Sequence, residues 1–438
     1  MNILKIFSLL LLSFQALGFA PEMLGSSATS MGLGMITHGE KDLAASNANT
    51  PSFLAFDSKA HFSFNLAYFK PHFNSINNVV IGNEMNTDDG VEKMGQSNVP
   101  NSSENIFIGS MALPLFHPSG PKLGLTFFAP LDRLAEASSG DPYLPEYVMY
   151  RSRLSRSAFI FNLIQKYKNL GISLGGYSGF QASGKTFFVA RTSGDTSPSS
   201  GQIDFNAKPS LAALFSLSYK EGSHLFSFVW QQQMKSRFET TASGFTPVGG
   251  GSLPFNLTMK SMAYYDPMIL RLGYQKQNDS WRFLSSLQFE KWDDYETPRL
   301  KLNQNGGVII GGSQPEKIKT KNIFMPQIAI EKTIKEVFYR IGYAYRASPL
   351  RKTHLKGSSN ALDPDSHLTT LGLGIPLKIW DKKIEFSVGY QYRFLENRKI
   401  IKTDGQENGS AGRKIGAPGY RMGGNTQSLM VGLNWETP

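Results

Sequence analysis

Apolar and polar residues alternate along several segments of about ten residues. In residues 383–394 (KIEFSVGYQYRF), every second side chain is apolar or aromatic, and the side chains between them are polar or small. Residues 336–346 (EVFYRIGYAYR) and 61–69 (HFSFNLAYF) repeat this pattern. Because successive side chains of a strand point to opposite faces, each segment predicts a β-strand with one apolar and one polar face.

The spacing of such segments predicts an even number of strands, fourteen, joined by long and short connections in turn. The short connections contain FHPSG, IQKYKN, KEGS, KQND, TIK and LKIWDK. Soluble sandwiches also alternate, but they have no reason for this regular asymmetry, which is typical of outer-membrane barrels. We therefore predict an all-β fold, a transmembrane antiparallel β-barrel. We expect its strands at residues 61–70, 105–115, 121–129, 150–163, 169–178, 209–219, 224–238, 267–276, 281–292, 322–332, 336–346, 367–376, 383–394 and 427–436, with long loops at 71–104, 130–149, 179–208, 239–266, 293–321, 347–366 and 395–426.

The positions of the tryptophans agree with a barrel that has its short turns at one end and its long loops at the other. Trp281, Trp380 and Trp435 fall at the short-turn ends of strands, and Trp292 falls at a long-loop end. Aromatic girdles of membrane barrels lie at these two interfaces. Trp230 falls in the middle of a strand and does not fit a girdle.

The first residues, MNILKIFSLLLLSFQALGFAPEM, have the pattern of a secretory signal peptide. Lys5 precedes a short apolar run at residues 6–12, and small residues follow at Gly18 and Ala20. The run is too short to span a membrane as a helix. We therefore expect a signal peptide at residues 1–18, cleaved after residue 18 or 20, and an exported chain.

The composition fits an exported barrel of the Gram-negative outer membrane. The 438 residues include 42 glycines, 12% aromatic residues and no cysteine, and the formal net charge is +11. The absence of cysteine excludes disulfides and thiolate metal sites. Basic residues do not alternate with aromatic ones as in a nucleic-acid module. We therefore expect the positive charge to meet outer-membrane lipid and lipopolysaccharide, and we expect no nucleic-acid partner.

Residues Gly179–Thr186, GFQASGKT, match the phosphate-binding pattern G-x-x-x-x-G-K-[ST]. A working phosphate loop follows a buried parallel strand and begins a helix. Here the pattern falls where the fifth strand enters a long loop, and the following FFVARTSGDTSPSSG has no helical apolar stripe. We therefore predict an external loop and no nucleotide partner.

Catalytic and metal-binding patterns are weak. The seven histidines have no i,i+4 pair and no metal-ligand spacing. DLAAS and WDDYE contain acids, but exposed carboxylates on loops are normally solvated surface. We therefore expect a protein that is not an enzyme and that uses no cofactor and no metal. The histidines are His38, His61, His72, His117, His224, His354 and His367.

Four stretches occur in an order and spacing that match one known family. They are residues 27–56 (SATSMGLGMITHGEKDLAASNANTPSFLAF), 267–298 (PMILRLGYQKQNDSWRFLSSLQFEKWDDYETP), 336–350 (EVFYRIGYAYRASPL) and 368–400 (LTTLGLGIPLKIWDKKIEFSVGYQYRFLENRKI). They resemble the FadL/TodX-type outer-membrane transporters of long-chain fatty acids and other hydrophobic compounds. The first resembles that family's Gly- and Ala-rich N-terminal hatch, and the others resemble its barrel hairpins.

This resemblance implies a fourteen-stranded barrel plugged by the hatch, with the hatch at residues 21–56 and the barrel at residues 57–438. Two features depart from the family. The chain has Asn49-Thr50-Pro51-Ser52 where the family usually has Asn-Pro-Ala, and it ends VGLNWETP instead of on the aromatic residue.

The resemblance also implies passive uptake of fatty acids or other hydrophobic compounds by a monomer, with lateral release into the membrane. We expect capture by Phe187, Phe188, Phe245 and Phe255 of the outer loops. In the family the lateral gap comes from a kink in the third strand, here KLGLTFF, which makes Gly124 the candidate. The alternative is a glycine that makes room for a neighbouring side chain.

Strand alternation places Arg282, Glu331, Arg340 and Glu385 on the inner face near the short turns. A charge facing lipid at mid-depth would cost about 2–4 kcal/mol, so the lumen is the favourable location. We expect these charges, with Asn49 and Pro51 of the hatch, to form a network that holds the hatch. The alternative is a lumen wall whose ions are only solvated.

A structural or adhesive outer-membrane barrel without transport activity is the alternative function. A purely structural barrel needs no Gly- and Ala-rich N-terminal plug, so this segment favours transport.

Overall fold

The structure is a computed structural model. It describes residues 21–39, 42–81, 93–97, 101, 103–131, 146–147, 150, 157–189, 201–248, 251–295, 301–304, 318–351, 361–379, 382–401, 413–414 and 419–437. The predicted signal peptide at residues 1–18 lies outside this part of the chain.

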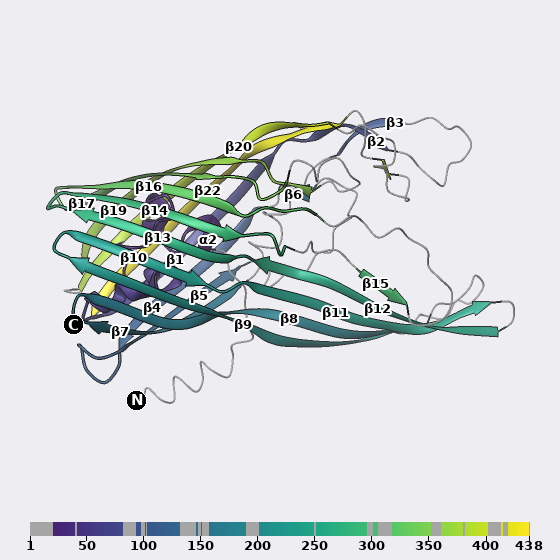
Figure 1. The fold of residues 1–438 in the computed structure, drawn as a ribbon, viewed down its shortest axis with the longest axis horizontal. Coiled ribbons are helices and arrows are strands. Elements are labelled where there is room, and N and C mark those ends of the chain that lie inside the picture. The colour runs from purple at the N-terminus through teal and green to yellow at the C-terminus, as the bar shows by residue number, and fades with distance from the viewer. Residues whose placement is uncertain are drawn as a thin grey trace.

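Within the described residues, fourteen antiparallel strands form a closed ring (Figure 1). Each pairs with the next, and the last strand pairs with the first from Ala60 with Thr437 to Phe73 with Gly424. The predicted all-β antiparallel barrel is therefore confirmed. Its strands are β1 (Ala60–Phe73), β4 (Glu104–Pro114), β5 (Lys122–Pro130), β7 (Ala158–Tyr167), β8 (Leu170–Val189), β9 (Gly201–Glu221), β10 (His224–Gln231), β13 (Met268–Gln277), β14 (Trp281–Lys291), β16 (Ile323–Ile334), β17 (Val337–Arg346), β19 (Ser366–Ile379), β20 (Lys382–Ile400) and β22 (Tyr420–Thr437).

Some predicted bounds are wrong. The fourth strand is Ala158–Tyr167, not 150–163, because its alternation continues into the residues that were assigned to the turn. Most of the ranges 179–208 and 239–266 are strand and not loop, since β8 and β9 continue past the ring and β11 (Met234–Val248) and β12 (Gly251–Asp266) extend it.

These strands form a sheet that projects from the long-loop end in Figure 1. β11 runs parallel to β8, β12 pairs with β11, and β15 (Lys301–Gln304) pairs with β12. Gly179–Thr186 lies inside β8, which continues to Val189. The pattern is therefore in a strand and not in the predicted loop, and the described residues that follow it, up to Val189, continue the strand where a phosphate loop would begin a helix.

Short strands complete this end of the molecule. β2 (Ile76–Ile81), β3 (Lys93–Ser97) and β21 (Arg413–Lys414) form a three-stranded sheet. β6 (Glu146–Tyr147) pairs with β18 (Ala361–Leu362).

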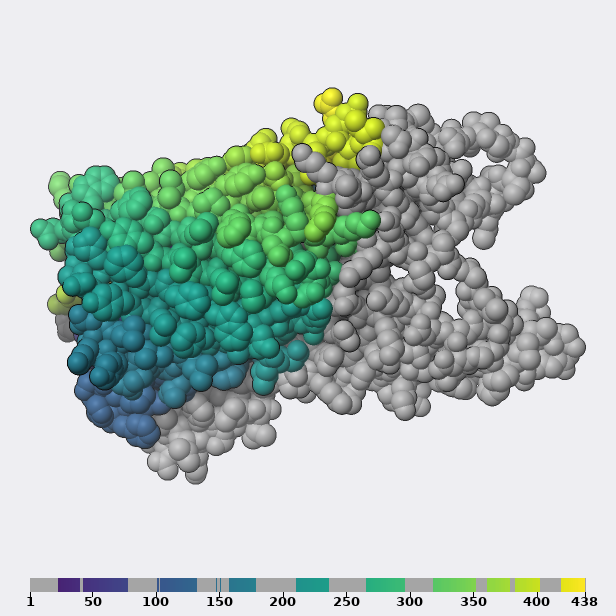
Figure 2. Space-filling model, in the orientation of Figure 1, coloured from purple at the N-terminus to yellow at the C-terminus, as the bar shows by residue number. Residues whose placement is uncertain are grey.

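The two faces of the barrel wall have inverted polarity relative to a soluble protein. Outward-facing Leu272, Leu371 and Ile328 are 57%, 54% and 52% exposed, whereas inward-facing Arg340 is 3% exposed. Figure 2 shows the outer surface of this wall. An apolar outer band around a polar interior is the arrangement that lipid around a barrel requires. Among the described helices, none is long and apolar enough to cross a membrane.

Residues 21–39 and 42–56 lie inside the ring and include four short helices, α2 (Pro21–Leu24), α3 (Ala28–Gly32), η1 (Ala45–Ala48) and η2 (Pro51–Phe56). This segment forms hydrogen bonds with β1, β5, β7, β9, β13, β16, β19 and β20, which lie around the whole ring. Glycines allow its closest approaches. A Cβ at Gly342 of β17 would lie 2.3 Å from the backbone N of Gly34.

Trp292 does not belong to an aromatic girdle as predicted. Its side chain is fully buried, and Trp292 Nε1 donates to Glu290 Oε2 at 2.7 Å. Its ring packs against Tyr265 and Tyr295. Trp281, which is 48% exposed at the start of β14, lies at the expected end of its strand.

Candidate functional site in the barrel lumen

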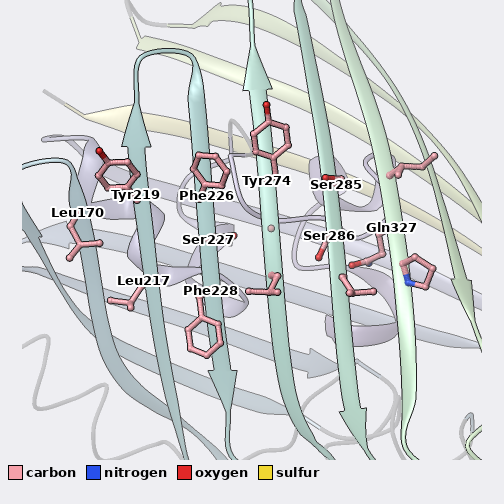
Figure 3. A pocket seen from close by; sticks show the side chains of 15 residues that line it. Leu170, Leu217, Tyr219, Phe226, Ser227, Phe228, Tyr274, Ser285, Ser286 and Gln327 are labelled. Carbon is pink, nitrogen blue, oxygen red and sulfur yellow. The ribbon is translucent and has the colours of Figure 1, made fainter.

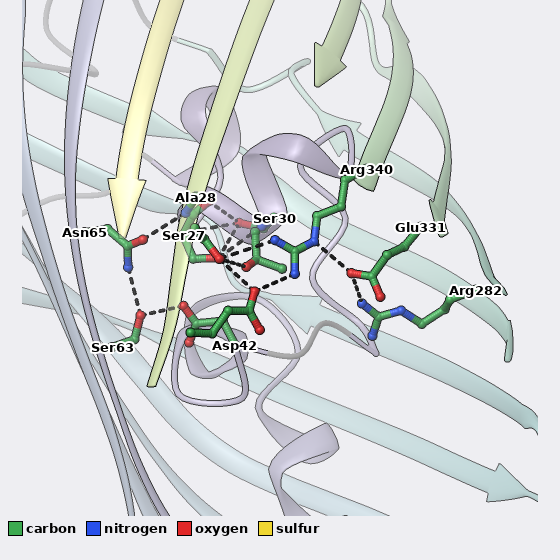
Figure 4. Close-up of polar contacts among 12 residues, drawn as sticks. Ser27, Ala28, Ser30, Asp42, Ser63, Asn65, Arg282, Glu331 and Arg340 are labelled. Carbon is green, nitrogen blue, oxygen red and sulfur yellow. Dashed lines mark hydrogen bonds and ion pairs between the residues drawn. The ribbon is translucent and has the colours of Figure 1, made fainter. Parts of the chain in front are cut away.

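A chain of ion pairs crosses the inner face of the wall near the short turns. Strand register places Arg282 of β14 opposite Glu331 of β16, and Glu331 opposite Arg340 of β17. Arg282 Nη2 and Arg340 Nε each donate to Glu331 Oε2 at 2.8 Å. Arg340 Nη2 donates to Glu385 Oε1 of β20 at 2.6 Å. The structure thus brings together the four charged residues that alternation placed in the lumen (Figure 4).

A glycine allows Arg340 and Glu385 to meet across the strand between them. A Cβ at Gly374 of β19 would lie 2.5 Å from Glu385 Oε1 and 2.7 Å from Arg340 Nη1. Any side chain at this position would displace the pair.

Hydroxyl groups connect the ion pairs to α3. Ser387 Oγ donates to Glu385 Oε1 at 2.8 Å and lies 3.2 Å from Thr29 Oγ1. Arg340 Nη1 also donates to Ser387 Oγ at 3.3 Å. The charges therefore reach residues 21–56 through Ser387 and Thr29.

Two titratable residues of the inner segment are fully buried. Burial raises the pKa of Asp42 to about 7, although Ser63 Oγ and the Ala45 amide donate to its carboxylate. Burial lowers the pKa of His38 to about 4, so this imidazole is neutral at pH 7. His38 Nε2 donates to the Tyr274 carbonyl at 3.2 Å, and its Nδ1 has no hydrogen-bond partner. Among the described residues, no group of three His, Asp or Glu side chains could hold a metal ion.

Asn49 and Pro51 lie apart from the ion pairs. The Asn49 carbonyl accepts a hydrogen bond from Arg271 Nη1 at 3.1 Å, and Arg271 Nε also donates to Gln288 Oε1 at 2.9 Å. Pro51 is buried as the first residue of η2. The predicted set is therefore divided between two places in the lumen.

Gly124 faces the side chain of Asn47. A Cβ at Gly124 would lie 2.0 Å from Asn47 Oδ1, which accepts from Asn162 Nδ2 at 2.9 Å. β5 pairs in unbroken register with β4 and β7 across this glycine. The glycine thus makes room for a neighbouring side chain, and a lateral gap at this position stays a prediction.

The four predicted capture residues lie on the strands that extend beyond the ring. Phe187 and Phe188 are on β8, Phe245 is on β11 and Phe255 is on β12. Backbone register places Gly244 of β11 opposite Phe188 on one side and Phe255 on the other. Phe187 precedes Phe188 and Phe245 follows Gly244, so all four share a short stretch of neighbouring backbone; their side chains lie outside the described part.

A second buried polar group, which the sequence analysis missed, lies nearer the long-loop end. Arg346 Nη1 pairs with Asp363 Oδ2 at 3.0 Å, and Arg346 Nε lies 3.9 Å from Glu290 Oε2. Arg393 Nη2 donates to the Met23 carbonyl of α2 at 3.4 Å. Glu290, Arg346 and Arg393 occupy inward-facing positions of β14, β17 and β20, so the alternation of side chains along these strands could have identified them. Nothing in the pattern identified Asp363, which precedes β19.

Two depressions of the described surface differ in their chemistry. One, of about 760 Å³, lies on the outer face of β9, β10, β13, β14 and β16. Figure 3 shows Tyr219, Phe226 and Tyr274 in one row across it, and this groove belongs to the lipid-facing band. The other, of about 610 Å³, is polar and lies at the short-turn end beside η2.

These features define a class: a closed fourteen-stranded membrane barrel whose polar lumen contains its own N-terminal segment. No family model matches the chain. In 241 residues it is 25% identical to alkane uptake protein A of Marinobacter nauticus, covering 50% of this chain and 51% of that protein. The aligned part thus spans about half the length of this curated relative.

One solved structure shows the same fold, and a second is reported beside it. A FadL homologue of Pseudomonas aeruginosa superposes with a TM-score of 0.59 and 13% identity, covering 94% of this chain and 98% of that one. The toluene transporter TodX of P. putida gives a TM-score of 0.48 and 12% identity, covering 95% and 99%. The resemblance inferred from the sequence is confirmed, because the chain has the FadL-type fold. None of these names denotes an enzyme, in agreement with our expectation.

Proposed function

We propose that the protein takes up hydrophobic compounds across the outer membrane without an energy source. The observation that carries this proposal is the N-terminal segment, which occupies the lumen but contributes no strand to the wall. It is held by side-chain hydrogen bonds and close glycine contacts, which can break while the barrel stays closed. We call residues 21–56 the hatch.

Long-chain fatty acids and alkanes are the cargo that we propose. The name of the alkane uptake relative and the FadL-type fold support this choice. Cargo would bind near Phe187, Phe188, Phe245 and Phe255, enter the lumen, and displace the hatch. A neutral hydrocarbon would then leave laterally into the membrane, where hydrocarbon tails accept it at no electrostatic cost.

Uptake by cells tests the proposal. The gene would be expressed in a Gram-negative host that lacks its own fatty-acid transporter, and entry of labelled palmitate, hexadecane and toluene would be measured. Faster entry of at least one compound than in cells with the empty vector is the expected result. Equal entry of all three, with the protein present in the outer membrane, would leave a structural or adhesive barrel as the better description.

A further inference from the structure

The apolar band on the outer face of β1, β22 and β20 ends in a cation at the long-loop end. β22 pairs with both other strands, and Figure 1 shows β20 and β22 side by side. Residues directly opposite each other in an antiparallel pair share one face. The register therefore gives two rows across the three strands: Tyr68, Leu429 and Tyr390, and then Lys70, Gln427 and Tyr392. Tyr68 and Tyr390 are 40% and 37% exposed toward the lipid, and Lys70 is exposed directly above them.

Two further cations lie farther from the membrane centre on the same strands. The register of β20 and β22 shifts by one residue in this region, and beyond the shift Lys399 lies opposite Arg421. The next opposed residues, Ile400 and Tyr420, are 1% and 3% exposed and point inward. Because neighbouring residues of a strand face opposite sides, Lys399 and Arg421 are exposed on the outer face. The row of Lys70 is about 20 Å away along β22, at about 3.3 Å per residue.

An amide bridge joins the ends of the three strands between these two levels. Asn74, which follows β1, donates from its Nδ2 to Asn397 Oδ1 of β20 at 3.1 Å. Gly423 of β22 makes room for this contact, since a Cβ at that position would lie 2.2 Å from Asn397 Oδ1. Both asparagines are exposed. The bridge therefore makes one continuous polar surface, which we call the outer basic surface and define as Lys70, Asn74, Asn397, Lys399 and Arg421.

The outer basic surface has an excess of positive charge. In the part of the chain that the structure describes, none of its three cations forms an ion pair. β1 contains no acidic residue, and Glu436 of β22 lies at the other end of its strand. Glu396 of β20 is paired with His367 Nε2 at 2.9 Å. Cations on an exposed face without acidic neighbours favour an anionic ligand.

We propose that the outer basic surface binds lipopolysaccharide of the outer leaflet. Lys70 would contact a phosphate of its lipid anchor, Lys399 and Arg421 would contact phosphates of the sugars above the anchor, and the acyl chains would lie on the rows of Tyr68 and Tyr392. Ammonium and guanidinium groups form charge-assisted hydrogen bonds with phosphate.

The two levels of cations select this lipid. A phospholipid carries its phosphate at one depth, next to the acyl chains, whereas a lipopolysaccharide carries phosphates on its lipid anchor and on the sugars beyond it. Cations about 20 Å apart along one strand fit the second arrangement. This inference rests on the outer-membrane location of the barrel and not on the proposed uptake.

Binding to three lipids tests the surface. The purified barrel, in detergent and freed of bound lipid, is titrated with diphosphorylated lipid A, with a lipopolysaccharide whose inner sugars are phosphorylated, and with phosphatidylglycerol, each in mixed micelles. The wild-type protein should bind the lipopolysaccharide most tightly, lipid A less tightly and phosphatidylglycerol least tightly.

Substitutions at the two levels should have different effects. One Lys or Arg beside an anionic lipid surface contributes about fivefold in affinity. Lys70→Gln should therefore weaken the binding of lipid A and of the lipopolysaccharide by about fivefold. Lys399→Gln/Arg421→Gln should weaken the binding of the lipopolysaccharide by about 25-fold and leave that of lipid A unchanged, because lipid A has no sugars at the outer level.

Two controls accompany these variants. Lys291→Gln removes a cation at the same end of the barrel whose Nζ lies 3.7 Å and 3.4 Å from carboxylate oxygens of Asp293 and Asp294, and it should bind all three lipids as the wild type does. The charge-retaining variant Lys70→Arg/Lys399→Arg/Arg421→Lys should also bind as the wild type does. The migration of unboiled samples on a detergent gel shows that each barrel is folded.

Four results would each overturn the proposal. They are equal affinity of the wild type for phosphatidylglycerol and for the lipopolysaccharide, an effect of Lys291→Gln as large as that of Lys70→Gln, unchanged binding of the lipopolysaccharide after Lys399→Gln/Arg421→Gln, and weaker binding by the charge-retaining variant.

Discussion

Arg340→Leu is the most informative perturbation of the lumen. The guanidinium of Arg340 joins two carboxylates on strands either side of it, Glu331 at 2.8 Å and Glu385 at 2.6 Å. Leucine fills part of the space but supplies no charge. Glu331 keeps Arg282 at 2.8 Å, whereas Glu385 keeps, within the part of the chain that the structure describes, the hydrogen bond from the Ser387 hydroxyl.

The cost falls mainly on Glu385. Breaking a buried ion pair by removing one partner costs about 3–5 kcal/mol. The side chain of Glu385 is 11% exposed, so water reaches it in part. We therefore expect a loss of about 3 kcal/mol, the lower end of that range. Through Ser387 and Thr29 this loss should act on closure of the hatch.

Solute leakage reports closure directly. Purified variants would be reconstituted in liposomes, and the entry of small polar sugars would be compared with the urea midpoint of the same samples. Arg340→Leu should raise leakage while the barrel still inserts. Arg282→Leu is the control, because it leaves Glu331 paired with Arg340, and it should have a smaller effect.

Removing both partners separates pairing from simple loss of a side chain. Arg340→Leu with Glu385→Leu leaves no uncompensated carboxylate, so leakage should fall back toward the wild-type value. If Arg340→Leu and Glu385→Leu each leave leakage and uptake unchanged, the charges belong to a solvated wall, and the network does not hold the hatch.

Three further predictions concern the barrel, the hatch and its pH dependence. Because a closed barrel satisfies its backbone hydrogen bonds internally, boiled and unboiled samples should migrate differently on a detergent gel; identical migration would contradict the fold. Deleting residues 21–56 should leave an inserted barrel that leaks polar solutes, and unchanged permeability would show that these residues do not plug it. Because the pKa of Asp42 is raised, Asp42 favours the closed hatch at low pH, and this contribution is lost as pH rises from about 4 to 7. Because the pKa of His38 is lowered, His38 disfavours the closed hatch as pH falls from 6.5 to about 4. Below pH 6.5 the two residues therefore change the stability of the closed hatch with pH in opposite directions. The hatch should become more stable as pH rises in Asp42→Asn and less stable as pH rises in His38→Gln. Leakage measured between pH 4 and 7 checks this, and parallel curves for the two variants would contradict both pKa shifts.

The strands and the inner charges could be predicted because one rule, the two-residue period, fixes both. A strand that spans lipid must present apolar side chains outward, so Arg340 and Glu385 could point only into the lumen. Register then decides which charges are neighbours, and the even spacing of short turns placed Arg282, Glu331 and Arg340 at one depth.

Features that depend on long-range packing could not be predicted. Residues 179–189 contain glycines and polar residues that suit a loop, yet pairing with β9 and β11 keeps them in a strand. Trp292 falls at the position of a girdle residue, but Glu290, Tyr265 and Tyr295 hold it inside. The space at Gly374 exists only because β17 and β20 are its neighbours, and no local pattern reveals it.

The pairing of β1 with β22 constrains the order in which this molecule can be assembled. The two strands are almost the whole length of the chain apart, and they join in continuous register from Ala60–Thr437 to Phe73–Gly424. This contact has the largest sequence separation in the wall, so its loop-closure entropy is the greatest. Residues 21–56 precede β1 and contact strands around the whole ring. The strands that hold this segment are therefore brought together as one ring only when this seam closes, and the segment gains its full set of wall contacts at that step.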